Sequence, residues 1–85
     1  MLVRLPGQRN RGVLFQTCDG ARHIISWRTL EQQFAYNIHS EDDAAVVFDL
    51  HAAAIERAAE VAQLHGDRVL DVEHFAEVTT LQATR

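Results

Sequence analysis

A long run of residues between Ser40 and Gly66, with apolar side chains at helical spacing, constrains the fold more than any other feature of this chain. Ser40 is a suitable N-cap, Asp43 stands at the third helical position as in a capping box, and Gly66 is a typical helix stop. The pattern predicts one helix over residues 41–65, roughly 37 Å long. The side chains predicted to share its inner face are Ala44, Val47, Phe48, His51, Ala54, Ile55, Ala58, Ala62 and His65.

A second constraint is the segment VLFQTCDGARHIIS, residues 13–26, which predicts a β-hairpin centred on Asp19-Gly20. A two-residue turn at this pair places Leu14 opposite Ile25. One face then holds Leu14, Gln16, Cys18, Ala21, His23 and Ile25, and the other holds Phe15, Thr17, Arg22 and Ile24. Both faces are half apolar, so the pattern leaves open which of them is the core. A short apolar segment over residues 2–5 predicts an edge strand.

Ser26 ends the second strand of this hairpin and is a good N-cap for a helix that begins at Trp27. Trp27, Leu30 and Phe34 lie at i, i+3 and i+7, which predicts the buried stripe of this helix. Asn37 is a suitable residue just beyond its C-terminal end.

The C-terminal part of the chain has two interpretations. Residues 68–72 predict a short strand, and residues 71–82 form either a helix capped by Asp71 or a frayed tail. In the helical interpretation, the inward-facing side chains are Val72, Phe75, Ala76 and Thr79.

The expected fold class is α+β: a single domain over residues 1–85, in which a small antiparallel β-sheet (the hairpin plus edge strands) is packed by one long and one or two short helices. A chain of 85 residues buries only about 60–65% of its unfolded surface, so self-association is a natural source of stability.

No apolar run is long enough to cross a membrane, and the N-terminus lacks the apolar stretch of a signal peptide. The single Cys18 forms no intrachain disulfide. We therefore expect a cytoplasmic protein with no membrane partner.

Charge is unevenly distributed along the chain, whose net charge is −4. Residues 1–28 hold five arginines against Asp19, whereas residues 29–85 hold three arginines against eleven acids. The basic N-terminal third suggests an alternative function in nucleic-acid binding, with Phe15 or Trp27 as a stacking platform. The overall acidic charge disfavours this alternative, because nucleic acid repels an acidic domain. The candidate phosphate contacts are Arg9, Arg11, Arg22 and Arg28.

Cysteine and histidine side chains raise a second alternative, a metal- or cysteine-dependent enzyme. Cys18, His23 and His51 are the candidate metal ligands, but the chain has none of the H-x-x-x-H, C-x-x-C or H-E-x-x-H spacings. Cys18 and His23 share one predicted hairpin face, as a nucleophile and its base would. A buried strand cysteine, a core histidine and a helix-capping Ser26 are the ordinary roles of these residues. We therefore predict no catalytic residue, no metal and no cofactor.

A set of mostly structural positions forms a pattern over residues 12–75: Leu14, Asp19-Gly20, Ile25-Ser26, Leu30-Glu31 and Phe34, and more loosely Ile55, Ala59 and Val69-Leu70. In these positions the chain resembles a small bacterial family known as domain of unknown function 1488, although His23 stands where a cysteine is expected. The resemblance implies an α+β fold and a bacterial cytosolic setting, but no activity. It also implies that the helices cover the hairpin face with Leu14, Gln16, Cys18, His23 and Ile25.

The function that the sequence favours is a small non-enzymatic interaction or regulatory module, which forms a homo-oligomer or binds another protein. A sheet with few helices leaves one face under-covered in a monomer. The residues predicted to form this partner surface are Val13, Phe15 and Ile24.

Overall fold

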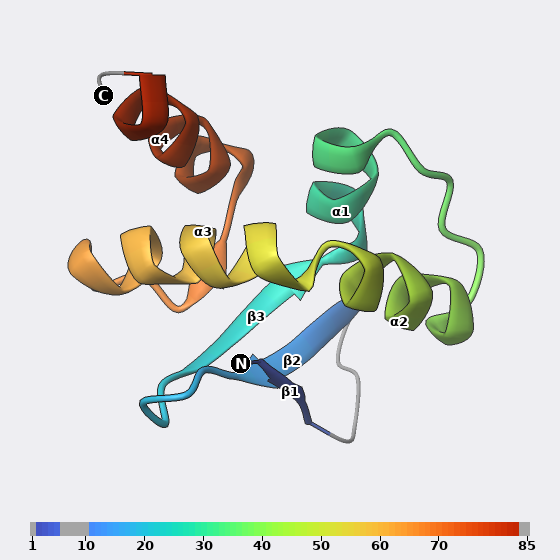
Figure 1. Ribbon diagram of the computed structural model, residues 1–85. Helices are drawn as coiled ribbons and strands as arrows, with labels where there is room; N and C mark the ends of the chain where they lie inside the picture. Colours follow the sequence, from blue (N-terminus) through green and yellow to red (C-terminus); the bar gives the residue numbers. More distant parts are fainter. Residues whose placement is uncertain (1, 6–10, 84–85) are drawn as a thin grey trace.

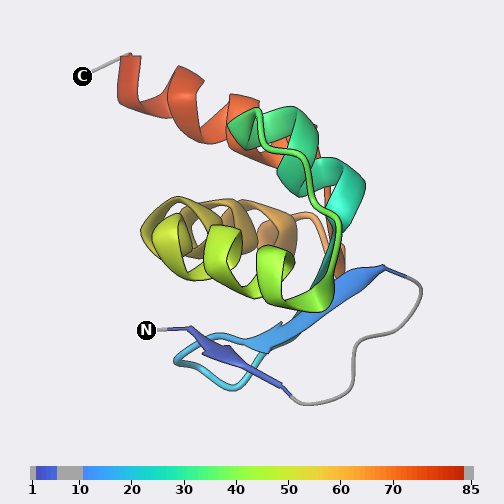
Figure 2. The same cartoon turned by 90° about the vertical axis from the view of Figure 1, so that its right-hand side faces the viewer.

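The computed structural model describes residues 2–5 and 11–83, the last five of them (79–83) by their backbone alone. Within these residues, the strands of one sheet follow the order β1 (Val3–Arg4), β2 (Gly12–Gln16), β3 (Arg22–Ser26) and β4 (Val69–Leu70). The helices are α1 (Trp27–Phe34), α2 (Glu41–Leu50), α3 (Ala52–Leu64) and α4 (Val72–Ala83). All of these helices lie on one side of the sheet (Figure 1, Figure 2).

The fold class is the predicted α+β arrangement, and β1 is an edge strand as expected. The sheet is antiparallel over β1, β2 and β3, but β4 pairs parallel to β3. Parallel neighbours need a long connection, and α1, α2 and α3 provide it. No helix in the described part of the chain is long and apolar enough to cross a membrane.

The β2–β3 turn differs from the predicted two-residue turn. The Thr17 amide donates to the Ala21 carbonyl oxygen at 2.8 Å, and the Gly20 amide donates to the Thr17 carbonyl oxygen at 3.0 Å. These bonds close a three-residue loop over residues 18–20, in which Gly20 adopts a φ of +88° that other residues rarely adopt. The pairing register is therefore shifted by one residue from the predicted one.

This shift decides which side chains of the hairpin face the helices. Phe15 lies opposite His23 and Val13 lies opposite Ile25, and all four side chains are buried. The side chains that alternate with them along the strands point away from the helices; they are Leu14, Gln16, Arg22 and Ile24.

The family resemblance implied that the helices cover one particular face of the hairpin. Only some residues of that face are covered. His23 and Ile25 do face the helices. Leu14 and Gln16 lie on the opposite face, and Cys18 is exposed in the turn. The implication is wrong for these three residues because it depended on the two-residue turn.

Helix α1 begins where the sequence predicts. Ser26 is its N-cap, and the Ser26 hydroxyl accepts a hydrogen bond from the Thr29 amide at 3.1 Å. Leu30 is fully buried, while Trp27 and Phe34 are partly buried and pack against the core. The predicted N-cap and buried stripe are both confirmed.

The C-terminal end of α1 comes earlier than predicted. Ala35 adopts a left-handed backbone conformation with a φ of +57°, so the last helical residue is Phe34. A left-handed residue ends a helix because its carbonyl and amide groups leave the helical hydrogen-bond pattern. Asn37 therefore lies in the loop beyond the helix, and its prediction as the terminating residue is wrong.

The predicted single helix over residues 41–65 is two helices that meet at His51. The His51 backbone, with φ −112° and ψ 21°, departs from helical geometry. Its ring stacks on Phe34 of α1, with ring centroids 4.0 Å apart and planes 7° from parallel. Helix α2 contacts α1 and β2, whereas α3 contacts β4 and α4. The bend at His51 lets each half pack against its own neighbours.

Both ends of this helical stretch are as predicted. The Ser40 hydroxyl accepts from the Asp43 amide at 3.2 Å, and Gly66 follows α3 with a φ of +75°. Most of the predicted inner face is buried, whereas His65 is exposed and His51 and Ala54 are partly buried.

Helix α4 confirms the helical interpretation of the C-terminal segment. Asp71 caps it, since its Oδ1 accepts from the Val72 amide at 2.8 Å. Phe75 is buried and Val72 is partly buried, whereas Ala76 is exposed instead of facing inward. The side chain of Thr79 lies outside the described residues.

The core fills the layer between the sheet and the helices. Its largest fully buried side chains come from strands and helices alike: Phe15, Ile25, Leu30, Phe48, Ile55 and Leu70. This core occupies one face of the sheet only.

Candidate interaction surface

The sheet face that points away from the helices carries a continuous apolar row. Leu14 pairs with Ile24, and Ile24 pairs with Val69. The Leu5 amide donates to the Leu14 carbonyl oxygen at 2.9 Å, which extends the row past the end of β1. Side chains at directly paired positions share one face of a sheet. Leu5, Leu14, Ile24 and Val69 therefore form one line from edge to edge, which we call the outer row.

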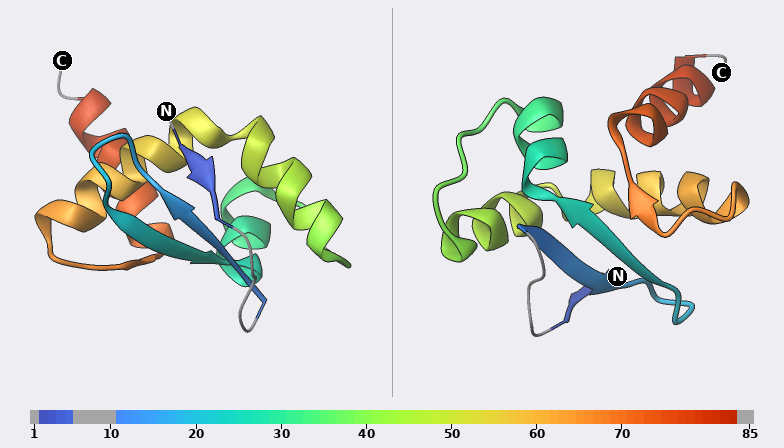
Figure 3. Two further views of the ribbon diagram at one scale, coloured as in Figure 1. Left: turned by 90° about the horizontal axis from the view of Figure 1, so that it is seen from below. Right: turned by 180° about the vertical axis from the view of Figure 1, so that it is seen from behind.

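No helix in the described residues covers the outer row. Seen from below, strands β1, β2 and β3 lie in front of the helices (Figure 3, left). Val69 is 58% exposed, and Val3 next to the row is also 58% exposed. Leu5, Leu14 and Ile24 are partly exposed. An apolar band across a whole sheet face is typical of a surface that packs against a partner.

The helical side of the molecule carries most of the negative charge. Nine of the eleven acids in residues 29–85 lie in helices, whereas the outer row has no ionisable side chain. The two sides of the protein thus differ: one is acidic and covers the core, and the other is open and carries the apolar outer row, with Gln16 and Arg22 beside it.

Of the three residues predicted as a partner surface, only Ile24 lies on the open face. Val13 is 2% exposed and Phe15 is 0% exposed, because the shifted register turns both toward the helices. Phe15 packs against Phe48 of α2, with ring centroids 5.2 Å apart. The prediction is wrong for Val13 and Phe15, and burial also excludes Phe15 as a platform for base stacking.

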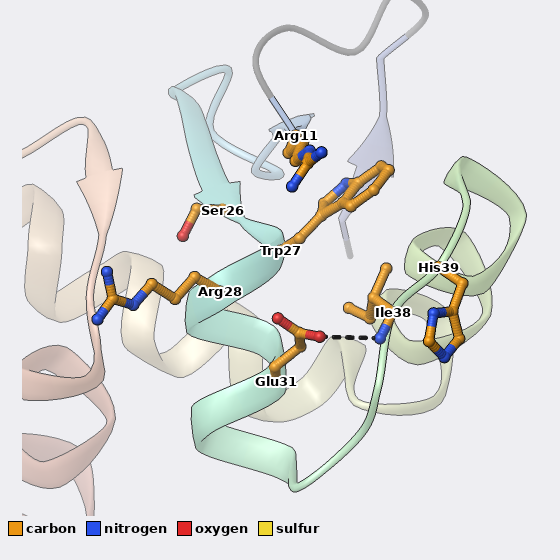
Figure 4. A pocket seen from close by; sticks show the side chains of 7 residues that line it. All are labelled: Arg11, Ser26, Trp27, Arg28, Glu31, Ile38 and His39. Carbon is orange, nitrogen blue, oxygen red and sulfur yellow. Dashed lines mark hydrogen bonds between the residues drawn. The ribbon is translucent and has the colours of Figure 1, made fainter.

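The arginines predicted as phosphate contacts do not gather on one surface. Arg11 and Arg28 line a cavity of about 730 Å³ beside α1, together with Trp27. Arg11 lies close to Trp27 in Figure 4, whereas Arg28 points away from both. Arg22 begins β3, at the opposite end of that strand from Arg28, and Arg9 lies outside the described residues.

The acidic group of this cavity has a structural role. Glu31 Oε2 accepts from the Ile38 amide at 3.0 Å (dashed line in Figure 4), which ties the loop after α1 to the helix. His39 also lines the cavity, and its backbone amide donates to Asp43 Oδ2 at 3.0 Å. The carboxylates here hold the loop that leads into α2.

The candidate metal ligands and catalytic residues lie apart. Cys18 is exposed in the turn, His23 is buried on the inner face of β3, and His51 lies at the junction of α2 and α3. Both ring nitrogens of His23 are buried without a hydrogen-bond partner, so His23 is not bonded to Cys18 or Ser26 as a base would be. Among the described residues, no three His, Cys, Asp or Glu side chains form a group that could hold a metal ion.

Two histidines outside the predicted sites join α3 and its loop to α4. The Asp71 amide donates to His74 Nδ1 at 2.9 Å. Neutral His74 therefore carries its hydrogen on Nε2 and donates to Asp67 Oδ2 at 3.1 Å. His65 Nε2 lies 2.9 Å from Glu77 Oε2. His74 thus occupies the capping-box position that Glu or Gln usually fills.

Hydrogen bonds in the β2–β3 turn lower the pKa of Asp19 below its ordinary value. The Thr17 hydroxyl bond is the largest cause, followed by the Ala21 amide and the Gln63 side-chain amide. Gln63 Nε2 donates to Asp19 Oδ2 at 3.2 Å, which joins the turn to α3. These donors favour the ionised carboxylate.

Comparisons with family models, with curated proteins and with solved structures find no match to this chain. These comparisons therefore assign no function to the chain. The outer row is the feature of the fold that a single folded chain leaves unexplained.

Sequence reasoning missed three of the four residues of the outer row: Leu5, Leu14 and Val69. A usable signal was present for Leu14, because an Asp-Gly pair also fits a three-residue hairpin loop that ends in a left-handed glycine. For Val69 no local signal existed, since its position depends on parallel pairing with β3.

Proposed function

We propose that this chain is a self-associating interaction module of the bacterial cytoplasm, and that two copies meet through the outer row. The observation that carries the proposal is the alignment of Leu5, Leu14, Ile24 and Val69 across a sheet face that no described helix covers. The activity is binding rather than catalysis. Membership of domain of unknown function 1488, which supplies the bacterial cytoplasmic setting, is part of the same proposal.

A second copy of the chain is the favoured occupant because the outer row is complementary to itself. A two-fold axis parallel to the row and lying between two sheets places each row directly against the same row of the other copy. Such an isologous contact is the commonest arrangement in homodimers. Two sheets packed in this way lie about 10 Å apart with interleaved side chains.

The charge distribution supports the same occupant. Helices carry nine of the eleven acids in residues 29–85, and they lie on the side of the sheet opposite to the outer row (Figure 2). Face-to-face packing of two sheets keeps these acidic layers on the outside, where their mutual repulsion is screened. Contact through the helices would instead bring two acidic surfaces together.

The size of the sheet predicts a weak dimer. Strands spaced about 4.8 Å apart make the outer row roughly 15 Å long. A contact confined to so short a row buries a surface area at the low end of the range for specific interfaces. We expect a dissociation constant on the order of 10 μM. Assembly would then respond to the concentration of the chain, which suits a regulatory module.

Sedimentation equilibrium with two matched variants tests the proposal. Val69 on the outer row is 58% exposed and Val46 on α2 is 59% exposed. Val69→Asp and Val46→Asp therefore make the same chemical change at sites of the same exposure. The wild type and Val46→Asp should approach twice the 9.6 kDa chain mass as concentration rises, whereas Val69→Asp should remain a monomer.

Circular dichroism confirms that both variants are folded before their masses are compared. A wild type that stays at the monomer mass throughout would contradict the proposal. Equal weakening by Val46→Asp and Val69→Asp would also contradict it, since the contact would then not depend on the outer row.

A further inference from the structure

A second cavity lies at the end of the sheet, away from the outer row. It has a volume of about 380 Å³ and is bounded by the β2–β3 turn on one side and by the connection from α3 to β4 on the other. We call it the end cleft; the residues that matter for its chemistry are Arg22, His23, Gln63, Asp67 and Arg68. Its volume is within the range of cavities that hold small molecules.

His23 gives the end cleft an unusual feature. The residue is 4% exposed, and both of its ring nitrogens are buried without a hydrogen-bond partner. A neutral imidazole has one donor and one acceptor nitrogen, and leaving them unpaired in the interior is unfavourable. Folded proteins leave few such groups unpaired, and each calls for an explanation such as a catalytic role or a bound water or ion.

The acidic and basic side chains of the end cleft differ in whether they already have a hydrogen-bond or ion-pair partner. Asp67 Oδ2 bonds to His74 Nε2 at 3.1 Å, and nearby Asp19 accepts from Gln63 at 3.2 Å. The guanidinium groups of Arg22 and Arg68 have no ion pair with any described carboxylate. The carboxylates are therefore already hydrogen-bonded, while the cations remain available to a ligand.

We propose that the end cleft binds a small molecule through an oxyanion, a phosphate or a carboxylate group, which Arg68 clamps while His23 donates to it. A guanidinium matches the two oxygens of such groups in a bidentate contact. Because the nitrogens of His23 are buried, the ligand must displace a neighbouring side chain to reach them. The end cleft shares no residue with the outer row, so a variant of the outer row can test whether this binding requires self-association.

Titration of the 15N-labelled chain with inorganic phosphate and, separately, with acetate tests the proposal by NMR at constant ionic strength. We expect saturable shifts confined to residues 20–23 and 63–68, with a dissociation constant of about 1 mM for the preferred anion. The phosphate and acetate arms distinguish a phosphorylated ligand from a carboxylic acid. Repeating the titration on Leu14→Thr, a change on β2 outside the end cleft, separates the result from self-association.

Three variants make the test specific. His23→Phe removes the unpaired nitrogens without opening the core, so it should fold and lose binding. Arg68→Gln should weaken binding at least about fivefold and leaves the core untouched if His23→Phe proves unstable. Arg57→Gln removes an exposed arginine of α3 outside the end cleft and should bind as the wild type does.

The proposal is overturned if neither anion produces a saturable shift, or if the shifts spread over all arginines and follow ionic strength alone. It is also overturned if Arg57→Gln and Arg68→Gln weaken binding equally. In each case the end cleft would be an ordinary surface depression.

Discussion

Leu14 and Ile24 lie directly opposite each other on β2 and β3, and both point away from the helices. They are the two central members of the outer row, with Leu5 and Val69 beyond them on either side. In an isologous dimer every residue of the interface is used twice. A change at this central pair should therefore affect association more strongly than a change elsewhere on the surface.

The double variant Leu14→Thr/Ile24→Thr should weaken self-association at least about tenfold, because it removes apolar area at four places in the dimer. Threonine retains a high preference for strands, so the monomer should remain folded. Dilution calorimetry measures the dissociation constant. Unchanged association in a folded double variant would show that the outer row is not the contact.

Replacement of Ser26 by alanine should lower the free energy of unfolding by about 1 kcal/mol, because the Thr29 amide loses the hydroxyl that caps α1. Ser26→Thr keeps a hydroxyl and should retain most of the stability. Urea unfolding of the three proteins provides the comparison. Equal stability of Ser26→Ala and the wild type would mean that the cap contributes nothing.

His74 should stabilise α4 through its ring nitrogens. His74→Ala removes the acceptor for the Asp71 amide and the donor to Asp67, so we expect a loss of about 1–2 kcal/mol in urea unfolding. His74→Gln restores a capping-box acceptor and should recover part of this loss. If glutamine proves no better than alanine, the capping role assigned to His74 is wrong.

Asp19 should make stability depend on pH in the acid range. Hydrogen bonds, first of all from Thr17, lower the pKa of Asp19 in the folded protein. The ionised carboxylate therefore stabilises the fold above its unfolded pKa of about 3.9, and this stabilisation is lost as the pH falls through the folded pKa. Between about pH 5 and pH 2 the wild type should therefore lose more stability than Asp19→Asn.

Chemical unfolding at several pH values measures this difference, and the other carboxyl groups cancel because both proteins contain them. A difference between wild type and Asp19→Asn that stays constant with pH would contradict the role of Asp19. The sign matters as well, since a greater acid loss in the variant would mean that burial rather than hydrogen bonding governs this carboxyl.

The fold was predictable from the sequence where structure depends on local chemistry. Ser26 and Ser40 cap helices because their hydroxyls reach amides three residues later, and Gly66 ends α3 because it adopts a positive φ. These effects act within a few residues, so a single sequence contains the information.

The features that were not predictable depend on contacts distant in sequence or on a choice between similar local forms. Asp19-Gly20 fits both a two-residue and a three-residue loop, and the difference of one residue moves the side chains of β2 to the opposite face relative to those of β3. At the bend, His51 stacks on Phe34 of another helix, a contact that helical spacing does not predict. In the candidate surface, Leu14 was missed because of the choice between these two loops, and Val69 was missed because its position depends on parallel pairing with β3.

The most direct test of self-association through the outer row is an isotope-filtered NMR experiment on an equal mixture of 13C-labelled and unlabelled chains, which detects contacts between copies only. We expect nuclear Overhauser effects between copies from the methyl groups of Leu14, Ile24 and Val69. Their absence, or effects that arise instead from the exposed helical residues Val46, Leu50 and Leu64, would contradict the account.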